Sequence, residues 1–278
     1  MPTTTLNLGE LSIEGWSRAG EATWLKVSPP GLALDVGRGA VELSGTRDLF
    51  LTHGHLDHAL GLPFVLSRRA REEEPPSRVF CPRPMVGDLV RFVEAAARLE
   101  RAEYRYEVLA LDPGDRVPVG RDLTIEAFAT HHVVPSLGFH LVRARRRLKD
   151  AFRGRSGEEL GRLRREGVDF EEATEEDWLS YCGDTGPKVF DSEPRIFSSR
   201  VLVLECTFLD PEKRASGVLY QHLHMDDLAA RAERFENQEL VLCHLSRRHR
   251  LRDGRQRAAE IFTGPRPRVH WIPAEEEP

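Results

Sequence analysis

The chain has 278 residues, of which 40% are hydrophobic and 31% charged, and a formal net charge of −5. This balance is typical of a folded globular protein and excludes a disordered chain. No apolar run reaches the ~18 residues of a spanning helix, and residues Met1–Glu10 lack the basic start and apolar stretch of a secretory signal. The four cysteines lie too far apart for paired metal-ligand spacing and fit reduced thiols in a cytoplasmic protein.

Strands and helices are predicted to alternate along the chain. Apolar residues alternate at period two in Leu123–Ala129, whereas Arg200–Leu204 and Glu239–Cys243 resemble central strands that are apolar on both faces. Further strands are predicted at Gly31–Val36 and Asp48–Thr52, and helices at Val86–Arg101 and Met225–Phe235. Polar residues that suit metals follow several strands, which predicts a layered α/β architecture with a site on one rim.

Residues 141–177 form a polar, arginine-rich excursion, which we expect to be a projecting helical insertion. Ser156–Glu159 resembles a capping box at the start of a helix. Between Leu141 and Gly167 there are ten Arg and Lys but four Asp and Glu, a local balance of +6. A second basic stretch, Arg247–Arg257, has six Arg and one Asp. On an acidic chain such patches are either solvated surfaces or selective phosphate contacts.

The segment Leu51–His58 carries the most specific motif. Its sequence, L-T-H-G-H-L-D-H, contains His53, His55, Asp57 and His58 in an H-x-H-x-D-H pattern. Imidazole and carboxylate ligands together suit zinc, and a tight turn after a strand can direct alternate side chains at two adjacent ions. Histidines exposed on a loop are the alternative reading of this segment.

With this motif the sequence resembles the metallo-β-lactamase superfamily, which implies an αββα sandwich; we expect residues 1–278 to form a single such domain. The resemblance implies that His132, in T-H-H-V-V-P-S, is the next ligand, with His131 as its competitor. It further implies Asp184, in Y-C-G-D-T, and His244, in V-L-C-H-L-S. The implied metal set for two Zn²⁺ ions is His53, His55 and His132 on one ion, Asp57, His58 and His244 on the other, and Asp184 bridging both.

Two further segments resemble ribonuclease Z, the tRNA 3′ endonuclease, in its short plant-type branch. L-E-C-T-F at 204–208 is similar to that family's E-A-T-F, and Q-H-L-H at 221–224 to its G-H-x-x segment. The resemblance implies that Glu205 and His222 form a pair in which His222 protonates the leaving oxygen, while Asp57 takes the proton of the attacking water. His224 is the alternative acid, and a buried Glu beside a surface His is the structural alternative.

The resemblance also implies phosphate contacts. H-L-S-R-R-H at 244–249 is similar to the family's H-F-S-x-R-Y, so Ser246 and Arg248 are expected to bind substrate. His249 replaces the usual Tyr, and Gln221 replaces the usual Gly. The long Gly-Pro arm of the common bacterial enzymes is missing, and we expect Arg145, Arg146 and Arg147 of the basic insertion to contact tRNA instead.

The sequence therefore predicts a zinc-dependent endoribonuclease that removes the 3′ trailer of precursor tRNA by metal-hydroxide attack on a phosphodiester. By resemblance to the family we expect a homodimer, located in the cytoplasm and not in a membrane. One alternative is a two-zinc phosphodiesterase for small diesters or cyclic nucleotides, which would not depend on the basic patches. Another is an RNA-binding protein with a weak or silent site, which would require a broken ligand set. A lactamase or thioesterase would leave Glu205 and His222 without a role.

Overall fold

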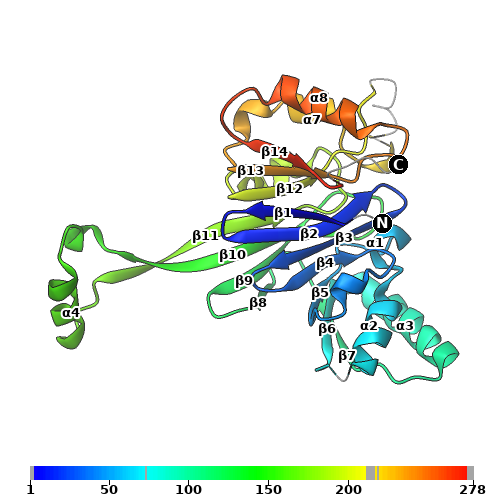
Figure 1. The fold of residues 1–278 in the computed structure, drawn as a ribbon, viewed down its shortest axis with the longest axis horizontal. Coiled ribbons are helices and arrows are strands. Elements are labelled where there is room, and N and C mark those ends of the chain that lie inside the picture. The colour runs from blue at the N-terminus through cyan, green and yellow to red at the C-terminus, as the bar shows by residue number, and fades with distance from the viewer. Residues whose placement is uncertain (1–2, 73, 211–216, 218, 274–278) are drawn as a thin grey trace.

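Two seven-stranded sheets lie face to face with helices on their outer sides (Figure 1). The computed structural model describes residues 3–72, 74–210, 217 and 219–273. In spatial order the first sheet contains β1 (Thr4–Leu8), β2 (Leu11–Arg18), β3 (Ala22–Ser28), β4 (Leu32–Val36), β5 (Asp48–Phe50), β6 (Ser77–Pro82) and β7 (Tyr106–Leu111). The second contains β14 (Arg268–Trp271), β13 (Glu239–Cys243), β12 (Val201–Glu205), β11 (Glu171–Tyr181), β10 (Leu137–Leu148), β9 (Leu123–Ala129) and β8 (Arg116–Pro118). The predicted αββα arrangement is confirmed.

The two sheets share one plan, in which an antiparallel half continues into a parallel half. Strands β1 to β4 pair antiparallel and β4 to β7 parallel. In the second sheet β8 to β11 pair antiparallel and β11 to β14 parallel. The predicted strands are confirmed, and β4, β12 and β13 are buried along their whole length, as strands covered on both faces must be.

The described helices, apart from the one at Gly157–Arg165, cover the outer faces of the two sheets (Figure 1). The described helices are α1 (Leu56–Ala59), α2 (Leu62–Arg71), α3 (Val86–Glu100), α4 (Gly157–Arg165), α5 (Val189–Ser192), α7 (Met225–Ala229) and α8 (Leu251–Ile261), with 3₁₀ turns at Val41–Leu43, Arg83–Met85, Asp150–Phe152, Pro194–Phe197 and Ala232–Arg234. One apolar cluster lies between the sheets, and one more lies between each sheet and its helices. These three cores hold the strand ends in fixed positions, which is what positions the site.

The helix predicted at Met225–Phe235 is shorter in the structure. Helix α7 ends at Ala229, and the chain turns so that Phe235 packs against Phe190 and Phe197. Arg234 lies over the ring of Phe197 at 4.1 Å. Aromatic packing in the outer core therefore ends the helix early, although no helix-breaking residue marks the place.

The prediction of a helical insertion at 141–177 is wrong for most of its length. β10 and β11 run out beyond the sheet as a two-stranded arm, and only its tip carries a helix, α4 (Figure 1). Ser156 does cap α4 in the predicted capping box with Glu159. The arm forms strands because its basic strand faces an acidic one: in the register, Arg143 lies opposite Glu176 and Arg147 opposite Glu172.

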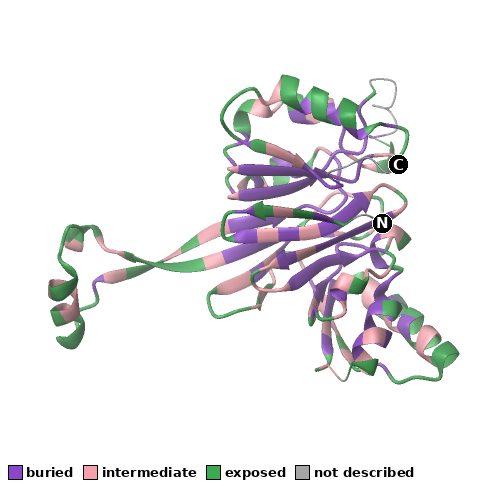
Figure 2. Ribbon diagram, viewed as in Figure 1, coloured by how far each residue is buried: buried purple, intermediate pink, exposed green. Residues whose placement is uncertain are grey.

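Acidic residues in and just before β11 also balance the positive charge of the insertion. Residues 168–177 add six acidic side chains, so 141–177 contains ten basic and ten acidic residues in all. Arg145 Nε lies 2.7 Å from Glu176, and Lys149 Nζ lies 2.7 Å from Asp169. The arm is therefore a neutral, largely exposed hairpin and not a basic helix (Figure 2).

Among the described residues, none of the helices has the length and the apolar character that crossing a membrane requires.

The arm should be removable without loss of stability. Replacing residues 149–170 by Asn-Gly would join Leu148 to Glu171, which already pair, through a two-residue turn. None of the described side chains removed belongs to the three cores, so we expect the melting temperature to change by less than about 3 °C. Trp178→Ala, in the buried part of β11, is the control and should cost about 3–5 kcal/mol. Equal losses in calorimetry for the two variants would contradict this picture.

Candidate metal and catalytic site

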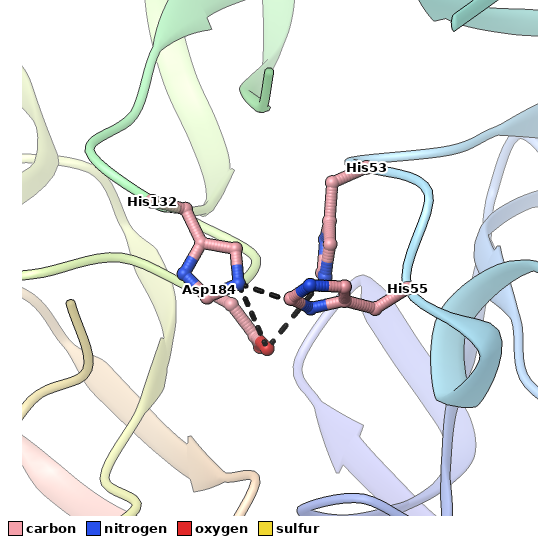
Figure 3. Close-up of side chains that lie close together, drawn as sticks. All are labelled: His53, His55, His132 and Asp184. Carbon is pink, nitrogen blue, oxygen red and sulfur yellow. Dashed lines mark hydrogen bonds and ion pairs between the residues drawn. The ribbon is translucent and has the colours of Figure 1, made fainter. Parts of the chain in front are cut away.

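The predicted metal ligands lie together where strands of both sheets end. His53, His55, Asp57 and His58 follow β5 and enter α1, and the other three follow β9, β11 and β13. These seven residues form two neighbouring groups at one edge of the sandwich: His53, His55, His132 and Asp184 in the first, and Asp57, His58 and His244 in the second. Asp184 and His244, one from each group, also lie close to His222. In each group the ligand atoms lie within 4.8 Å of one another. Figure 3 shows the first group, with the side chains of His53, His55 and His132 turned toward Asp184.

Asp184 lies at the centre of both groups. Its Oδ2 is 3.8 Å from His53 Nε2 and 4.0 Å from His132 Nε2. The same oxygen is 3.4 Å from His58 Nε2 and 3.3 Å from His244 Nε2. A single carboxylate oxygen therefore contacts both groups, which is the position that a bridging ligand needs.

The protonation preferences of the first group fit a metal. Burial lowers the pKa of His53 well below its ordinary value, and burial also lowers the pKa values of His55 and His132. Neutral imidazole is the form that binds metal ions. His53 Nε2 is buried without any hydrogen-bond partner, although it points at Asp184. An unpartnered buried nitrogen is costly unless a ligand fills the place.

In the second group, contacts between histidines and carboxylates shift the pKa values. Burial acts against charge on His58, but Asp184 and Asp35 outweigh it and raise the pKa of this histidine well above its ordinary value. Burial would raise the pKa of Asp57, yet the hydrogen bond from His244 and the nearby histidine charges lower it. These values apply without an ion, and a cation would replace the proton. Five imidazoles and two carboxylates form a donor set that suits a divalent metal such as zinc.

Asp35 supports the metal ligands from behind and was not identified from the sequence as a site residue. It is fully buried at the end of β4 and accepts hydrogen bonds from His58 Nδ1 at 2.8 Å and from the hydroxyl of Tyr181 at 2.8 Å. The backbone N–H of Thr52 donates to it at 2.7 Å. Asp35 therefore fixes the tautomer of His58 so that Nε2 faces the site. The one available signal was an aspartate inside an otherwise apolar strand.

Glu205 and His222 form a close pair beside the metal ligands. His222 Nδ1 lies 2.8 Å from Glu205 Oε1, and the His222 ring stands 5.0 Å from that of His132. Burial alone would lower the pKa of His222, but Glu205, helped by Asp184, raises it to about 9. His222 thus holds a proton at neutral pH in this arrangement and keeps 14% of its side chain exposed.

The competing histidines have other partners. His131 Nε2 lies 2.9 Å from the hydroxyl of Ser192 and takes no part in the two groups of ligands. His224 is buried and begins α7: its Nδ1 accepts from the N–H of Asp226, and its Nε2 donates to the carbonyl of Asp210. The geometry therefore favours His132 over His131 as ligand and His222 over His224 as proton donor.

The expected substrate contacts lie at two separate places. Ser246 and Arg248 follow His244 directly; Ser246 is half-buried, and its hydroxyl accepts from the N–H of Arg248 at 3.4 Å. Arg145, Arg146 and Arg147 lie on the arm, away from this edge (Figure 1). Ser246 and Arg248 thus lie two and four positions after His244 in the sequence, whereas the structure does not bring the three arm arginines to the candidate metal ligands.

Two departures from the family's pattern have structural explanations. Gln221 has φ of +54°, a left-handed conformation that favours the glycine usual at this position. His249 is buried, and its Nε2 accepts from the N–H of Leu209 at 3.2 Å. Neither residue is a metal ligand in the described geometry, so the departures leave the donor set intact.

An αββα sandwich with five histidines and two carboxylates at one edge defines a metal-dependent member of the metallo-β-lactamase fold class. A family model described as a β-lactamase superfamily domain matches residues 40–245, and the chain belongs to this superfamily. Within it, the chain is similar to tRNase Z TRZ1 of Arabidopsis thaliana, with 29% identity over 244 residues and 87% coverage of each protein. The resemblance to ribonuclease Z that the sequence indicates is confirmed.

Solved structures agree on the fold. The metallo-β-lactamase fold protein YhfI from Bacillus subtilis has a TM-score of 0.63 at 15% identity, covering 92% of this chain and 93% of that one. Human tRNase Z, short form, has a TM-score of 0.56 at 20% identity, covering 84% and 92%. At these identities the likeness establishes the architecture alone.

Asp35→Asn should weaken metal binding. The amide cannot carry the charge that holds the Nδ1 proton of His58, so we expect zinc affinity, measured by competition with a chromophoric chelator, to fall about 10–100-fold. Asp112→Asn, at an exposed aspartate paired with Arg83, is the matched control and should bind zinc like the unchanged protein. Unchanged affinity in Asp35→Asn would show that Asp35 does not position the ligand.

Proposed function

We propose that the chain is an endoribonuclease that uses two zinc ions to remove the 3′ trailer of precursor tRNA. The chain is a metal-dependent phosphodiester hydrolase; the metal identity, the number of ions and the substrate are the finer parts of the proposal. The observation that carries it is the Glu205–His222 pair, 2.8 Å apart and next to the metal ligands. Cleaving an RNA phosphodiester releases a basic 3′-oxygen, which needs a proton. Similarity to tRNase Z over nearly the whole chain supports the choice of tRNA.

The side chains of the site divide the work of hydrolysis. Bound between the two groups of ligands, two zinc ions would supply an activated water and neutralise charge on the phosphate. The Asp57 carboxylate, oriented by the N–H of Gly20 at 2.8 Å, would take up the proton of that water. His222 would donate its proton to the departing 3′-oxygen while Glu205 holds the ring in place. Ser246 and Arg248 would hold phosphate oxygens at the edge of the site.

Cleavage of a precursor tRNA tests the proposal directly. Zinc-loaded protein should cut after the acceptor stem and leave a 3′-hydroxyl on the tRNA. His222→Ala should slow this step by about 10²–10⁴-fold because it removes the proton donor. His131→Ala, which changes a neighbouring histidine outside the ligand set, is the control and should cut within a few-fold of the unchanged protein. Hydrolysis of bis-p-nitrophenyl phosphate without cleavage of tRNA would favour the small-substrate phosphodiesterase instead.

The second part of the proposal is that the arm binds tRNA at a distance from the phosphodiester that is cleaved. Arg145 and Arg146 lie 2.7 Å from Glu176 and 3.6 Å from Glu171, and Arg147 faces Glu172 in the register. Exposed pairs of this kind contribute about 0–1 kcal/mol each, so phosphates can displace the carboxylates. The tip adds further exposed arginines, among them Arg162 and Arg164.

Replacing Arg145, Arg146 and Arg147 with Ala should weaken tRNA binding and lower its dependence on salt, by up to about 0.9 in the logarithmic slope for each phosphate that the arm no longer neutralises. The matched control replaces Arg71, Arg91 and Arg98, which are also exposed and paired with carboxylates but lie on α2 and α3. Binding would be measured at several salt concentrations. If both triple variants bind tRNA alike, the arm does not bind tRNA.

We also propose that the protein is a homodimer located in the cytoplasm. Leu56 and Phe92 are exposed at 63% and 36% and line the same apolar hollow beside the metal ligands. Apolar surface of this kind is a common feature of subunit contacts.

The proposed location in the cytoplasm is supported by the four free cysteines, which are all buried and fit a reducing compartment.

A further inference from the structure

Glu205 is a buried carboxylate with every one of its accepting positions in use. Its Oε1 accepts from His222 Nδ1 at 2.8 Å and from the N–H of Thr185 at 2.8 Å. Its Oε2 accepts from the N–H of Leu223 at 3.2 Å and from the hydroxyl of Thr207 at 2.5 Å. Glu205 therefore acts as the acceptor in all four contacts.

Thr207 links this carboxylate to a metal ligand. Its hydroxyl oxygen lies 3.0 Å from His244 Nδ1, and the residue is buried. A hydroxyl has a single proton, and Thr207 gives that proton to Glu205. The contact with His244 must then run in the other direction, from the imidazole Nδ1–H to the Thr207 oxygen. This leaves His244 Nε2 as the nitrogen that faces Asp57 and Asp184, at 3.4 and 3.3 Å.

We propose that Thr207 is a positioning residue that joins the metal ligand His244 to the proton donor His222 through Glu205. The chain of contacts runs from His244 Nδ1–H to Thr207, from the Thr207 hydroxyl to Glu205 Oε2, and from His222 Nδ1–H to Glu205 Oε1. It sets the direction of three hydrogen bonds at once. The rings of His222 and His244 lie nearly parallel with centroids 5.3 Å apart. The link through Thr207 and Glu205 therefore holds the His222 ring in a fixed position beside the His244 ring.

The first sheet contains the same arrangement on its own side of the site. Thr52 Oγ1 lies 2.9 Å from His53 Nδ1 and 2.9 Å from Asp35 Oδ2, and Asp35 also holds His58 Nδ1 at 2.8 Å. In both sheets a buried carboxylate thus binds one histidine directly and a second one through a threonine. The difference is that His53 and His58 are both candidate metal ligands, whereas His222, although it lies within reach of Asp184 and His244, has the proposed role of proton donor. Thr52 therefore provides a matched comparison for Thr207.

The inference rests on the proposed role of His222 as proton donor, but it does not need tRNA as substrate. Removing the Thr207 hydroxyl would leave His244 Nδ1–H without its acceptor and Glu205 Oε2 with one donor fewer. We therefore expect a weaker metal site and a displaced proton donor from one substitution. Thr52→Val would weaken the metal site alone.

The experiment compares Thr207→Val, Thr207→Ser, Thr52→Val and His222→Ala in the zinc-loaded protein with two small diesters. Bis-p-nitrophenyl phosphate releases a weakly basic phenolate that leaves without protonation, whereas diphenyl phosphate releases a more basic one. Thr207→Val should lose about tenfold more rate on diphenyl phosphate than on the nitrophenyl ester. Zinc affinity, measured by chelator competition, should fall about 10–100-fold, and the imidazole ¹⁵N shifts of His244 should change. Thr207→Ser should restore all three.

The outcomes distinguish failure of the Thr207 link from failure of the proposed role of His222. Thr52→Val should lose zinc affinity and slow both diesters equally. If Thr207→Val also slows both equally while His222→Ala distinguishes them, Thr207 does not position the donor and the inference fails. If His222→Ala slows both diesters equally, the assignment of His222 fails, and the function proposed for the pair fails with it. Unchanged zinc affinity and His244 shifts in Thr207→Val would also overturn the link.

Discussion

The position of one carboxylate oxygen, Oδ2 of Asp184, is the constraint on which the site depends. Four imidazole nitrogens lie within 4.0 Å of it, from segments that follow three different strands. Gathering such groups away from water is expensive unless a cation and fixed hydrogen bonds compensate. The three apolar cores make this possible because they fix the strand ends before any ligand arrives. Packing of the sandwich is thus the source of the site's geometry.

The two sheets contribute to the site in parallel ways. Each has a buried carboxylate at the end of a fully buried strand, Asp35 near the end of β4 and Glu205 at the end of β12. Each carboxylate orients two histidines, one of them through a threonine. In the first sheet both histidines belong to the groups of candidate metal ligands; in the second, one of them is His222, the proposed proton donor. On the proposed function, the same local arrangement would supply metal ligands in one sheet and an acid in the other.

Several parts of the site were predictable from the sequence because their signals are local. Four of the candidate ligands fall within His53–His58, so their spacing alone was enough to predict them, and the structure brings them together with Asp184 and His244. Asp184 and His244 stand singly at strand ends and needed the resemblance to a family. Asp35, Thr52 and Thr207 were missed because a buried polar residue takes its role from its partners, and Asp35 meets Tyr181 across 146 positions of sequence. The arm was misjudged for a similar reason: its basic strand was counted without the acidic strand that only the register places opposite.

The acidic strand of the arm has a consequence for selectivity. Its carboxylates pair with the arginines in the way that phosphates would, so β11 would compete with any polyanion that binds the arm. A ligand whose charges do not match the arginines would gain little binding free energy by displacing Glu171 and Glu176. The arginines would lose nearly as much attraction to these carboxylates as they gain from the ligand. A rigid backbone whose phosphates match the spacing of the arginines gains from several sites together. If the arm binds RNA as proposed, the acidic residues of β11 would therefore make its affinity depend on how well the spacing of the phosphates matches that of the arginines.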